Sequence, residues 1–135
     1  MIVEENYIKL KYPSHLEFNK KIRPVLVNWS ETLGDFRLKQ KDALNNSEWA
    51  DRHQYFPLES SWHSEDDLYV DEMFQPFCQF ILGLTTGIFN QEFKFSSMWA
   101  KVARKNSYGK RHSHRGAISG VYYVDNGYYN KDDEI

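Results

Sequence analysis

The chain has 135 residues and a formal net charge of −2 at pH 7, which fits one small domain and argues against a nucleic-acid partner. Its single cysteine, Cys78, excludes an intrachain disulfide and fits a reducing compartment such as the cytoplasm. No apolar run reaches the ~20 residues that a membrane-spanning helix needs. The charged start, Met1 to Leu10, is typical of neither a signal peptide nor an anchor, so we expect a soluble cytoplasmic protein without membrane contact.

The first part of the chain predicts one strand and one helix. Residues Ile2 to Tyr12 alternate loosely between apolar and polar side chains, as an early strand does. Ser14 then precedes a helix, which Pro24 is expected to kink or split. The apolar residues expected on one side of this helix are Leu16, Ile22, Leu26 and Trp29. The polar stretch Thr32 to Asn46 predicts a loop with a short turn around Gly34.

A second and stronger helix is predicted after residue 64. Ser64 opens a run that resembles a capping box, because an acid stands three residues after the serine. Apolar residues then recur at spacings of three and four, as on the buried face of a helix. They are Met73, Phe77, Phe80, Ile81, Leu84 and Ile88. Pro76 fits only the first turn of such a helix, Gly87 is a plausible stop, and Cys78 is expected to pack rather than react.

From residue 93 onward the pattern changes to that of strands. Alternating stretches occur at 93–95 and 98–102, and Ala117 to Val124 is rich in β-branched and aromatic residues. Asp125-Asn126-Gly127 then predicts a turn. Helices followed by antiparallel strands predict one α+β domain over 1–135, with helices packed on one face of a β-sandwich or jelly roll. The helical part is expected over about 1–90 and the strands over about 91–135.

Basic residues are concentrated in the part of the chain where strands are predicted. No acidic residue stands between Phe93 and Val124, whereas basic residues recur there. The basic residues are Lys94, Lys101, Arg104, Lys105, Lys110, Arg111 and Arg115. This distribution is compatible with a solvated basic surface and with a site that receives a small carboxylate or a phosphate.

Two of the five histidines form a pattern that can bind a metal. His112 and His114 are two apart, and residues i and i+2 of a strand share one face. Two imidazoles on one face can chelate Zn, Fe, Cu or Ni. The arginines on either side weaken metal affinity by repulsion and favour an anionic co-ligand. The isolated histidines are expected at the surface or at helix caps; they are His15, His53 and His63.

Several stretches around this histidine pair resemble one protein family. They read Trp62-His63-Ser64, Met98-Trp99-Ala100-Lys101-Val102, Tyr108-Gly109-Lys110-Arg111-His112-Ser113-His114 and Ser119-Gly120-Val121-Tyr122-Tyr123-Val124. Together they resemble a group of 2-oxoglutarate/Fe(II)-dependent oxygenases of phages and bacteria, within the prolyl-hydroxylase-like superfamily. The resemblance covers residues Trp62 to Val124, and the histidine pair with the Ser-Gly-Val-Tyr-Tyr strand is its specific part.

The resemblance implies a double-stranded β-helix, or jelly roll, that binds Fe(II) and 2-oxoglutarate. It implies that His112 is the first iron ligand and that His114 takes the position usually held by a carboxylate. Because a histidine supplies no negative charge, the site either has three histidines or takes a ligand from elsewhere. Tyr123 matches the tyrosine that bonds the distal carboxylate of 2-oxoglutarate, although it can equally be a sheet aromatic. The implied reaction converts 2-oxoglutarate and oxygen to succinate and carbon dioxide while an unknown substrate is hydroxylated.

The family's remaining motifs, a distal histidine ligand and a basic residue for 2-oxoglutarate, are expected well after the Tyr-Tyr strand. The eleven residues after Val124 contain neither histidine nor arginine. We therefore expect an incomplete oxygenase domain: a fragment, half of a split gene, or a degenerate relative. The degenerate form would be a catalytically inactive phage structural or accessory protein. A phage-encoded chain would act in the host cytoplasm, and a second copy or a second chain would complete the sheet.

Two other functions fit these residues, and one segment is a candidate substrate loop. A histidine pair alone also fits a cupin-like metal-binding domain with unrelated chemistry. The basic stretch could stack nucleic-acid bases on its aromatic rings, although the overall charge opposes high affinity. The segment Asp35 to Trp62 is a candidate lid or substrate loop, because loops on such a scaffold usually set specificity.

Overall fold

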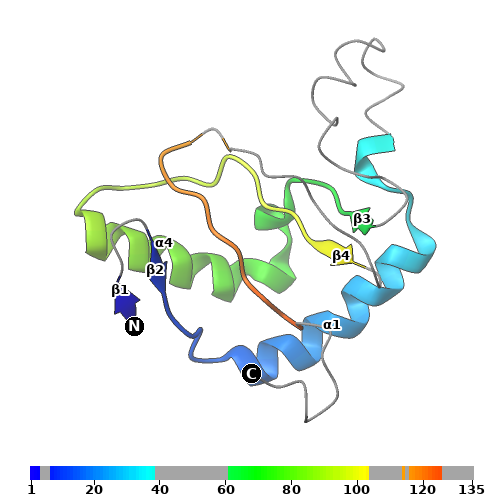
Figure 1. The fold of residues 1–135 in the computed structure, drawn as a ribbon, viewed down its shortest axis with the longest axis horizontal. Helices are drawn as coiled ribbons and strands as arrows, with labels where there is room; N and C mark the ends of the chain where they lie inside the picture. The colour runs from blue at the N-terminus through cyan, green and yellow to red at the C-terminus, as the bar shows by residue number, and fades with distance from the viewer. Residues whose placement is uncertain (4–6, 39–60, 104–113, 115, 126–135) are drawn as a thin grey trace.

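The structure is a computed structural model that describes residues 1–3, 7–38, 61–103, 114 and 116–125. Within these ranges, two long helices converge and an extended C-terminal segment crosses them (Figure 1). Helix α1 spans His15–Thr32 and helix α4 spans Gln75–Phe89. Two 3-10 helices, η2 at Leu68–Val70 and η3 at Glu72–Phe74, lead directly into α4.

The described strands form two separate antiparallel pairs. Strand β1 (Ile2–Val3) pairs with β2 (Ile8–Lys9), and β3 (Ser61–His63) pairs with β4 (Lys101–Ala103). The segment that follows β3 also lies beside the segment that precedes β4. Met98 N–H donates to Asp66 O at 2.8 Å, and Leu68 N–H donates to Met98 O at 3.0 Å. The described residues thus combine helices with small antiparallel sheets, which confirms the α+β class, and the jelly roll stays a prediction.

Aromatic side chains from both helices and from the flanking segments form the core. Phe18 of α1 stacks on Phe77 of α4, with ring centroids 5.2 Å apart. Tyr122, from the C-terminal segment, covers this pair, with its ring centroid 4.9 Å from that of Phe77. The buried apolar residues of this core are Tyr12, Phe18, Ile22, Leu26, Leu68, Phe74, Phe77 and Cys78. The expectation that Cys78 packs in the core is therefore confirmed.

Helix α1 differs from its prediction in two respects. It continues through Pro24 without a break, because a proline removes one backbone donor while the surrounding turns keep theirs. Leu16 is 76% exposed and does not join the apolar side. It stands two residues before the buried Phe18, which at ~100° per residue places it on nearly the opposite face of the helix. Ile22 and Leu26 are buried as predicted.

Helix α4 begins after Met73, which lies in η3, and it ends slightly later than predicted. Pro76 lies in its first turn, as expected. The helix continues past Gly87 to Phe89, and Asn90 ends it in the left-handed conformation with φ 50°. The predicted capping role of Ser64 is wrong, because its hydroxyl donates to Glu65 O and accepts from Ala100 N. Asp71 acts as the cap instead, accepting a hydrogen bond from Met73 N–H at 2.9 Å.

The strand predictions are confirmed only in part among the described residues. The early strand is a pair of two-residue strands, β1 and β2. Residues 93–95 and 117–124 are extended but carry no ladder, because no described segment offers them a backbone partner. Tyr122 and Val124 instead turn inward onto the core and leave Val121 and Tyr123 exposed.

Among the described residues, no helix has both the length and the hydropathy that a membrane-spanning helix needs.

Candidate functional site

Strand β3 divides its neighbourhood into two sides. Successive residues of a strand point to opposite faces, so Ser61 and His63 face one way while Trp62 and Ser64 face the other. All four are buried. The side of Ser61 and His63 holds a polar cluster, an aromatic stack and His114, and we treat it as the candidate functional site.

A buried ion pair lies beneath this site. Arg37 is 1% exposed and its Nη2 donates to Asp35 Oδ2 at 2.7 Å, while its Nε donates to Oδ1 at 3.0 Å. The same Nη2 donates to Ser61 O at 2.9 Å, and His63 N–H donates to Asp35 Oδ2 at 3.1 Å. The pair therefore ties the turn after α1 to strand β3. This bidentate arrangement gives each carboxylate oxygen of Asp35 a guanidinium donor where water is excluded.

Asp35 is held ionised by this arrangement. Burial alone raises the pKa of its carboxyl, but the hydrogen bonds and charge of Arg37 and the His63 N–H together hold that pKa below its usual value of 3.8. Asp35 also accepts a hydrogen bond from Arg37 N–H at 2.8 Å, and the backbone is helical at residues 36–38. It thus acts as a cap as well as a counterion.

Three rings form a stack beside the ion pair, and a fourth ring, that of His114, is tilted by 47° against the last of them. The His63 ring lies against Phe36 on one side, with centroids 6.1 Å apart, and against Trp99 on the other, 5.3 Å apart with planes within 13°. The ring of His114 lies against Trp99 at 5.6 Å. His63 Nδ1 is 2.6 Å from Ser64 O, and a carbonyl only accepts, so Nδ1 carries a proton and Nε2 is the acceptor in the neutral ring.

Lys101 adds positive charge beside the stack. It lies opposite His63 in the register of β3 and β4. Burial and the positive charge of Arg37 lower the pKa of its ammonium group, and Asp35 partly opposes that effect. The site therefore combines imidazoles, a tryptophan face and a lysine on a base that contains an ion pair.

The structure describes two of the three predicted site residues, His114 and Tyr123. His114 is described, exposed and in contact with Trp99, whereas His112 lies outside the described residues. Tyr123 is 76% exposed, while its neighbour Tyr122 packs in the core, so the two tyrosines face opposite ways. Among the described residues, no group of three or more histidine, cysteine, aspartate or glutamate side chains could hold a metal.

The environment of His63 differs from its prediction, and the ion pair is a feature that the sequence pattern does not predict. His63, expected at the surface or at a helix cap, is buried, because strand β3 and the two flanking rings enclose it. The ends of the segment predicted as a lid or substrate loop, Asp35, Arg37 and Trp62, are buried anchors, and residues 39–60 lie outside the described ranges. An aspartate directly after Gly34, with an arginine two residues later, is the signal that could have indicated a capped, paired turn.

The C-terminal segment is anchored on α1 by two polar contacts. Tyr122 Oη donates to Asn19 Oδ1 at 2.5 Å, and Arg23 Nε donates to Asp125 Oδ2 at 2.7 Å. Burial raises the pKa of the Tyr122 hydroxyl, an effect that the hydrogen bond to Asn19 partly offsets. These contacts fix the position of the segment that contains Tyr123.

Comparison of the chain with protein-family models, with curated proteins and with solved structures found no match.

Proposed function

We propose that the chain is a non-haem Fe(II)- and 2-oxoglutarate-dependent oxygenase domain, or the N-terminal part of one, that hydroxylates an unknown substrate. The observation that supports it most directly is that the ring of Trp99 contacts the rings of both His63 and His114. These rings come from three stretches that resemble the oxygenase family yet are far apart in the sequence. Their meeting in space is expected if the three stretches build one site.

The proposed metal ligands are His112 and His114. Imidazole nitrogens suit Fe(II), and the ring of His114 is exposed on one side and limited by Trp99 on the other. The described residues hold no complete ligand group, so His112 and a third ligand from outside them complete the proposed site. When bound, Fe(II) and 2-oxoglutarate supply the oxidative chemistry. The chain supplies ligand orientation, in which the Trp99 face restricts how the His114 ring can turn.

The remaining residues of the proposed site bind the anionic co-substrate. Tyr123 presents its hydroxyl at the surface, where it can donate to the distal carboxylate of 2-oxoglutarate. The exposed Lys94 and the partly desolvated Lys101 add positive charge to the same part of the chain. In the proposal, the extended residues 117–124 become a strand of a jelly roll when a further segment or a second chain pairs with them.

The first experiment is anaerobic and uses the visible charge-transfer band of an Fe(II)–2-oxoglutarate complex. Fe(II) and 2-oxoglutarate are added to the purified chain, and we expect a weak visible band. His112→Ala and His114→Ala should abolish it, whereas His15→Ala should preserve it, because His15 lies at the start of α1 with its Nδ1 on Tyr12 O.

Three outcomes separate the alternatives. No band from a sample with native circular dichroism would exclude an oxygenase formed by this chain alone. Metal binding that depends on His112 but is indifferent to 2-oxoglutarate would favour a cupin-like domain with other chemistry. A band that survives both histidine substitutions would refute the proposed ligands.

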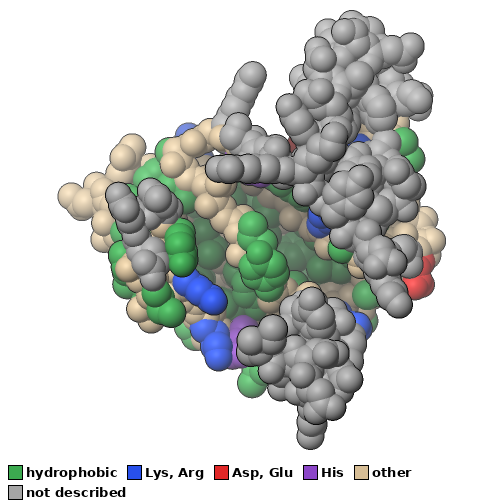
Figure 2. Space-filling model, in the orientation of Figure 1, with side chains coloured by type: hydrophobic (Ala, Val, Ile, Leu, Met, Phe, Trp, Pro, Cys, Tyr) green, Lys and Arg blue, Asp and Glu red, His purple; other side chains and the backbone are tan. Residues whose placement is uncertain are grey.

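A second candidate function is a catalytically inactive phage structural or accessory protein on the same scaffold. The exposed apolar face of the C-terminal segment favours it, since Val121 and Tyr123 are 77% and 76% exposed. Figure 2 shows hydrophobic side chains gathered on the face where this segment runs. Concentration-dependent association without metal, measured by sedimentation and reduced by Val121→Asp, would support this function over the oxygenase.

A further inference from the structure

A cleft lies on the side of β3 opposite the candidate functional site. Its volume is about 210 Å³, whereas an apolar cavity of ~150 Å³ is already large enough for one benzene ring. Its lining residues among those described are Trp29, Leu33, Gly34, Trp62, Ser64, Glu65, Asp67 and Leu68. Because Trp62 and Ser64 alternate with His63 along the strand, the cleft and the rings around His63 are separate places.

The two indole rings of the cleft differ from the other aromatic side chains in lacking a ring partner. Within the described part of the chain, every other aromatic side chain that is buried or half-buried contacts another ring. Trp29 is half-buried and Trp62 is 8% exposed, yet neither contacts a ring of the described residues. Aromatic rings gain from offset or edge-to-face neighbours, so the cleft holds two rings whose faces are available to a third.

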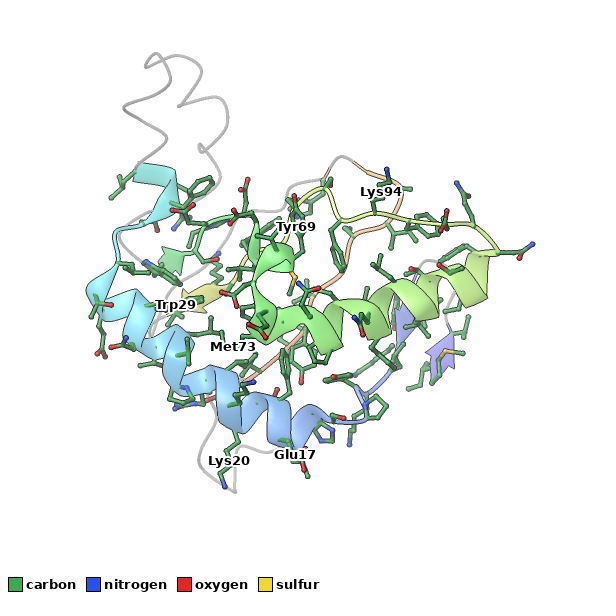
Figure 3. All side chains as sticks on the ribbon, turned by 180° about the vertical axis from the view of Figure 1, so that it is seen from behind. Glu17, Lys20, Trp29, Tyr69, Met73 and Lys94 are labelled. Atoms are coloured by element: carbon green, nitrogen blue, oxygen red, sulfur yellow. The ribbon has the colours of Figure 1, made fainter. Side chains whose placement is uncertain are left out.

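Two hydrogen bonds through Leu33 link the indole rings into one frame. Leu33 N–H donates to Trp29 O at 2.8 Å, and the Trp62 indole N–H donates to Leu33 O at 3.0 Å. The Trp62 ring therefore cannot turn freely, and Trp29 lies on the side of α1 that faces β3 and β4 (Figure 3). Ser64 Oγ also has internal partners, because it donates to Glu65 O at 2.7 Å and accepts from Ala100 N–H at 2.8 Å. Since the frame is preformed, a ligand that enters it orders little of the protein.

We propose that this cleft is a binding site for a small planar aromatic molecule, whose ring lies against the indole rings of Trp29 and Trp62. The volume of the cleft admits one ring with a short substituent. The buried Leu68 and the half-exposed Leu33 add aliphatic contact, as is usual in small-molecule sites. A neutral ring needs no charged side chain, so its binding requires neither the acidic residues of the cleft nor iron and 2-oxoglutarate.

The test uses benzyl alcohol as the probe and cyclohexylmethanol, which has the same heavy-atom skeleton but a saturated ring, as the matched control. Each is titrated into the full chain, and NMR follows the indole N–H signals of Trp29 and Trp62, which Trp29→Phe and Trp62→Phe identify. Burial of apolar area alone favours the saturated ring, whereas an aromatic pair adds roughly two- to tenfold in affinity. We therefore expect benzyl alcohol to bind at least about twofold more tightly. No saturable shift of these two signals, or tighter binding of cyclohexylmethanol, would overturn the proposal.

Variants assign the preference to the indole rings of the cleft. Trp29→Leu should remove most of the preference for benzyl alcohol, whereas Trp29→Phe, which keeps a ring, should retain it. Tyr7→Leu is the matched control, because Tyr7 is 60% exposed and does not line the cleft, and it should leave both affinities unchanged. An unchanged preference in a folded Trp29→Leu chain, or an equal loss in Tyr7→Leu, would refute the site. His112→Ala should leave binding unchanged, which keeps this test separate from that of the oxygenase.

Discussion

The ion pair of Asp35 and Arg37 makes a sharp prediction about stability. Each carboxylate oxygen of Asp35 accepts two hydrogen bonds: Oδ1 from Arg37 N–H and Nε, and Oδ2 from Arg37 Nη2 and His63 N–H. In Asp35→Asn, one of these acceptors becomes an amide NH₂ group. Whichever way the amide turns, its NH₂ faces two donors, so two hydrogen bonds are lost in either orientation.

The expected loss is large because the guanidinium stays buried. Arg37 is 1% exposed and keeps its charge at any accessible pH. Removing one partner of a buried pair typically destabilises a protein by about 3–5 kcal/mol, and we expect Asp35→Asn to fall in this range. Arg37→Met should be milder, at about 1–3 kcal/mol, because Asp35 keeps two backbone donors.

Urea unfolding followed by tryptophan fluorescence measures these differences, since Trp62 and Trp99 adjoin the cluster. Asp66→Asn is the control for the chemical change itself and should alter the free energy of unfolding by less than about 0.5 kcal/mol. A change below about 1 kcal/mol for Asp35→Asn would refute the reasoning, because a buried charge cannot lose its partner so cheaply.

The same pair also predicts a dependence on pH. The folded state lowers the pKa of Asp35 below its usual 3.8, so the unfolded chain takes up the proton first as the pH falls. The stability that ionised Asp35 contributes is therefore complete above 3.8 and disappears as the pH falls through the lower folded pKa. The advantage of the wild-type chain over Asp35→Asn should shrink in that acid range and stay constant near neutral pH.

Three further substitutions or reactions test other parts of the fold. Tyr122→Phe removes the hydrogen bond to Asn19 and should lower the free energy of unfolding by about 1 kcal/mol, while Tyr123→Phe, at an exposed position, should change it little in the same denaturation assay. Pro24→Ala should raise the free energy of unfolding by up to ~3 kcal/mol, and with it the urea midpoint, because alanine restores a backbone donor inside α1. A lower midpoint would show that the proline ring contributes packing. Cys78 is 3% exposed and burial raises the pKa of its thiol, so a thiol reagent should label it at least ~100-fold more slowly in the native chain than in urea.

Periodicity predicted the helices well because a buried face imposes its spacing on the sequence. The spacing of apolar residues located α4, and the rule for proline in a first turn placed Pro76 correctly. The end of α4 was missed because Gly87 competes with Asn90, and both residue types can end a helix in the left-handed conformation.

Features that depend on distant partners were not predictable from local pattern. The composition of residues 117–124 fits a strand, but strand formation needs a neighbour that composition does not specify. His63 looked like an isolated surface histidine because its enclosing rings, Phe36 and Trp99, are 27 and 36 residues away in the sequence. The resemblance includes the stretches that contain Trp99 and His114, and the rings of these two residues are in contact.

The anchoring of the C-terminal segment on α1 has a consequence for the order of folding. Asn19 and Tyr122 are 103 residues apart, and Arg23 and Asp125 are 102 apart. At ~5–20 residues per second, a ribosome makes Tyr122 about 5–20 s after Asn19. In the last part of that interval, once α4 has been made, Phe77 of α4 can pack on Phe18 of α1, and only the arrival of Tyr122 closes the core. The nascent chain therefore carries a partly exposed aromatic surface for seconds, the period in which a chaperone would protect it.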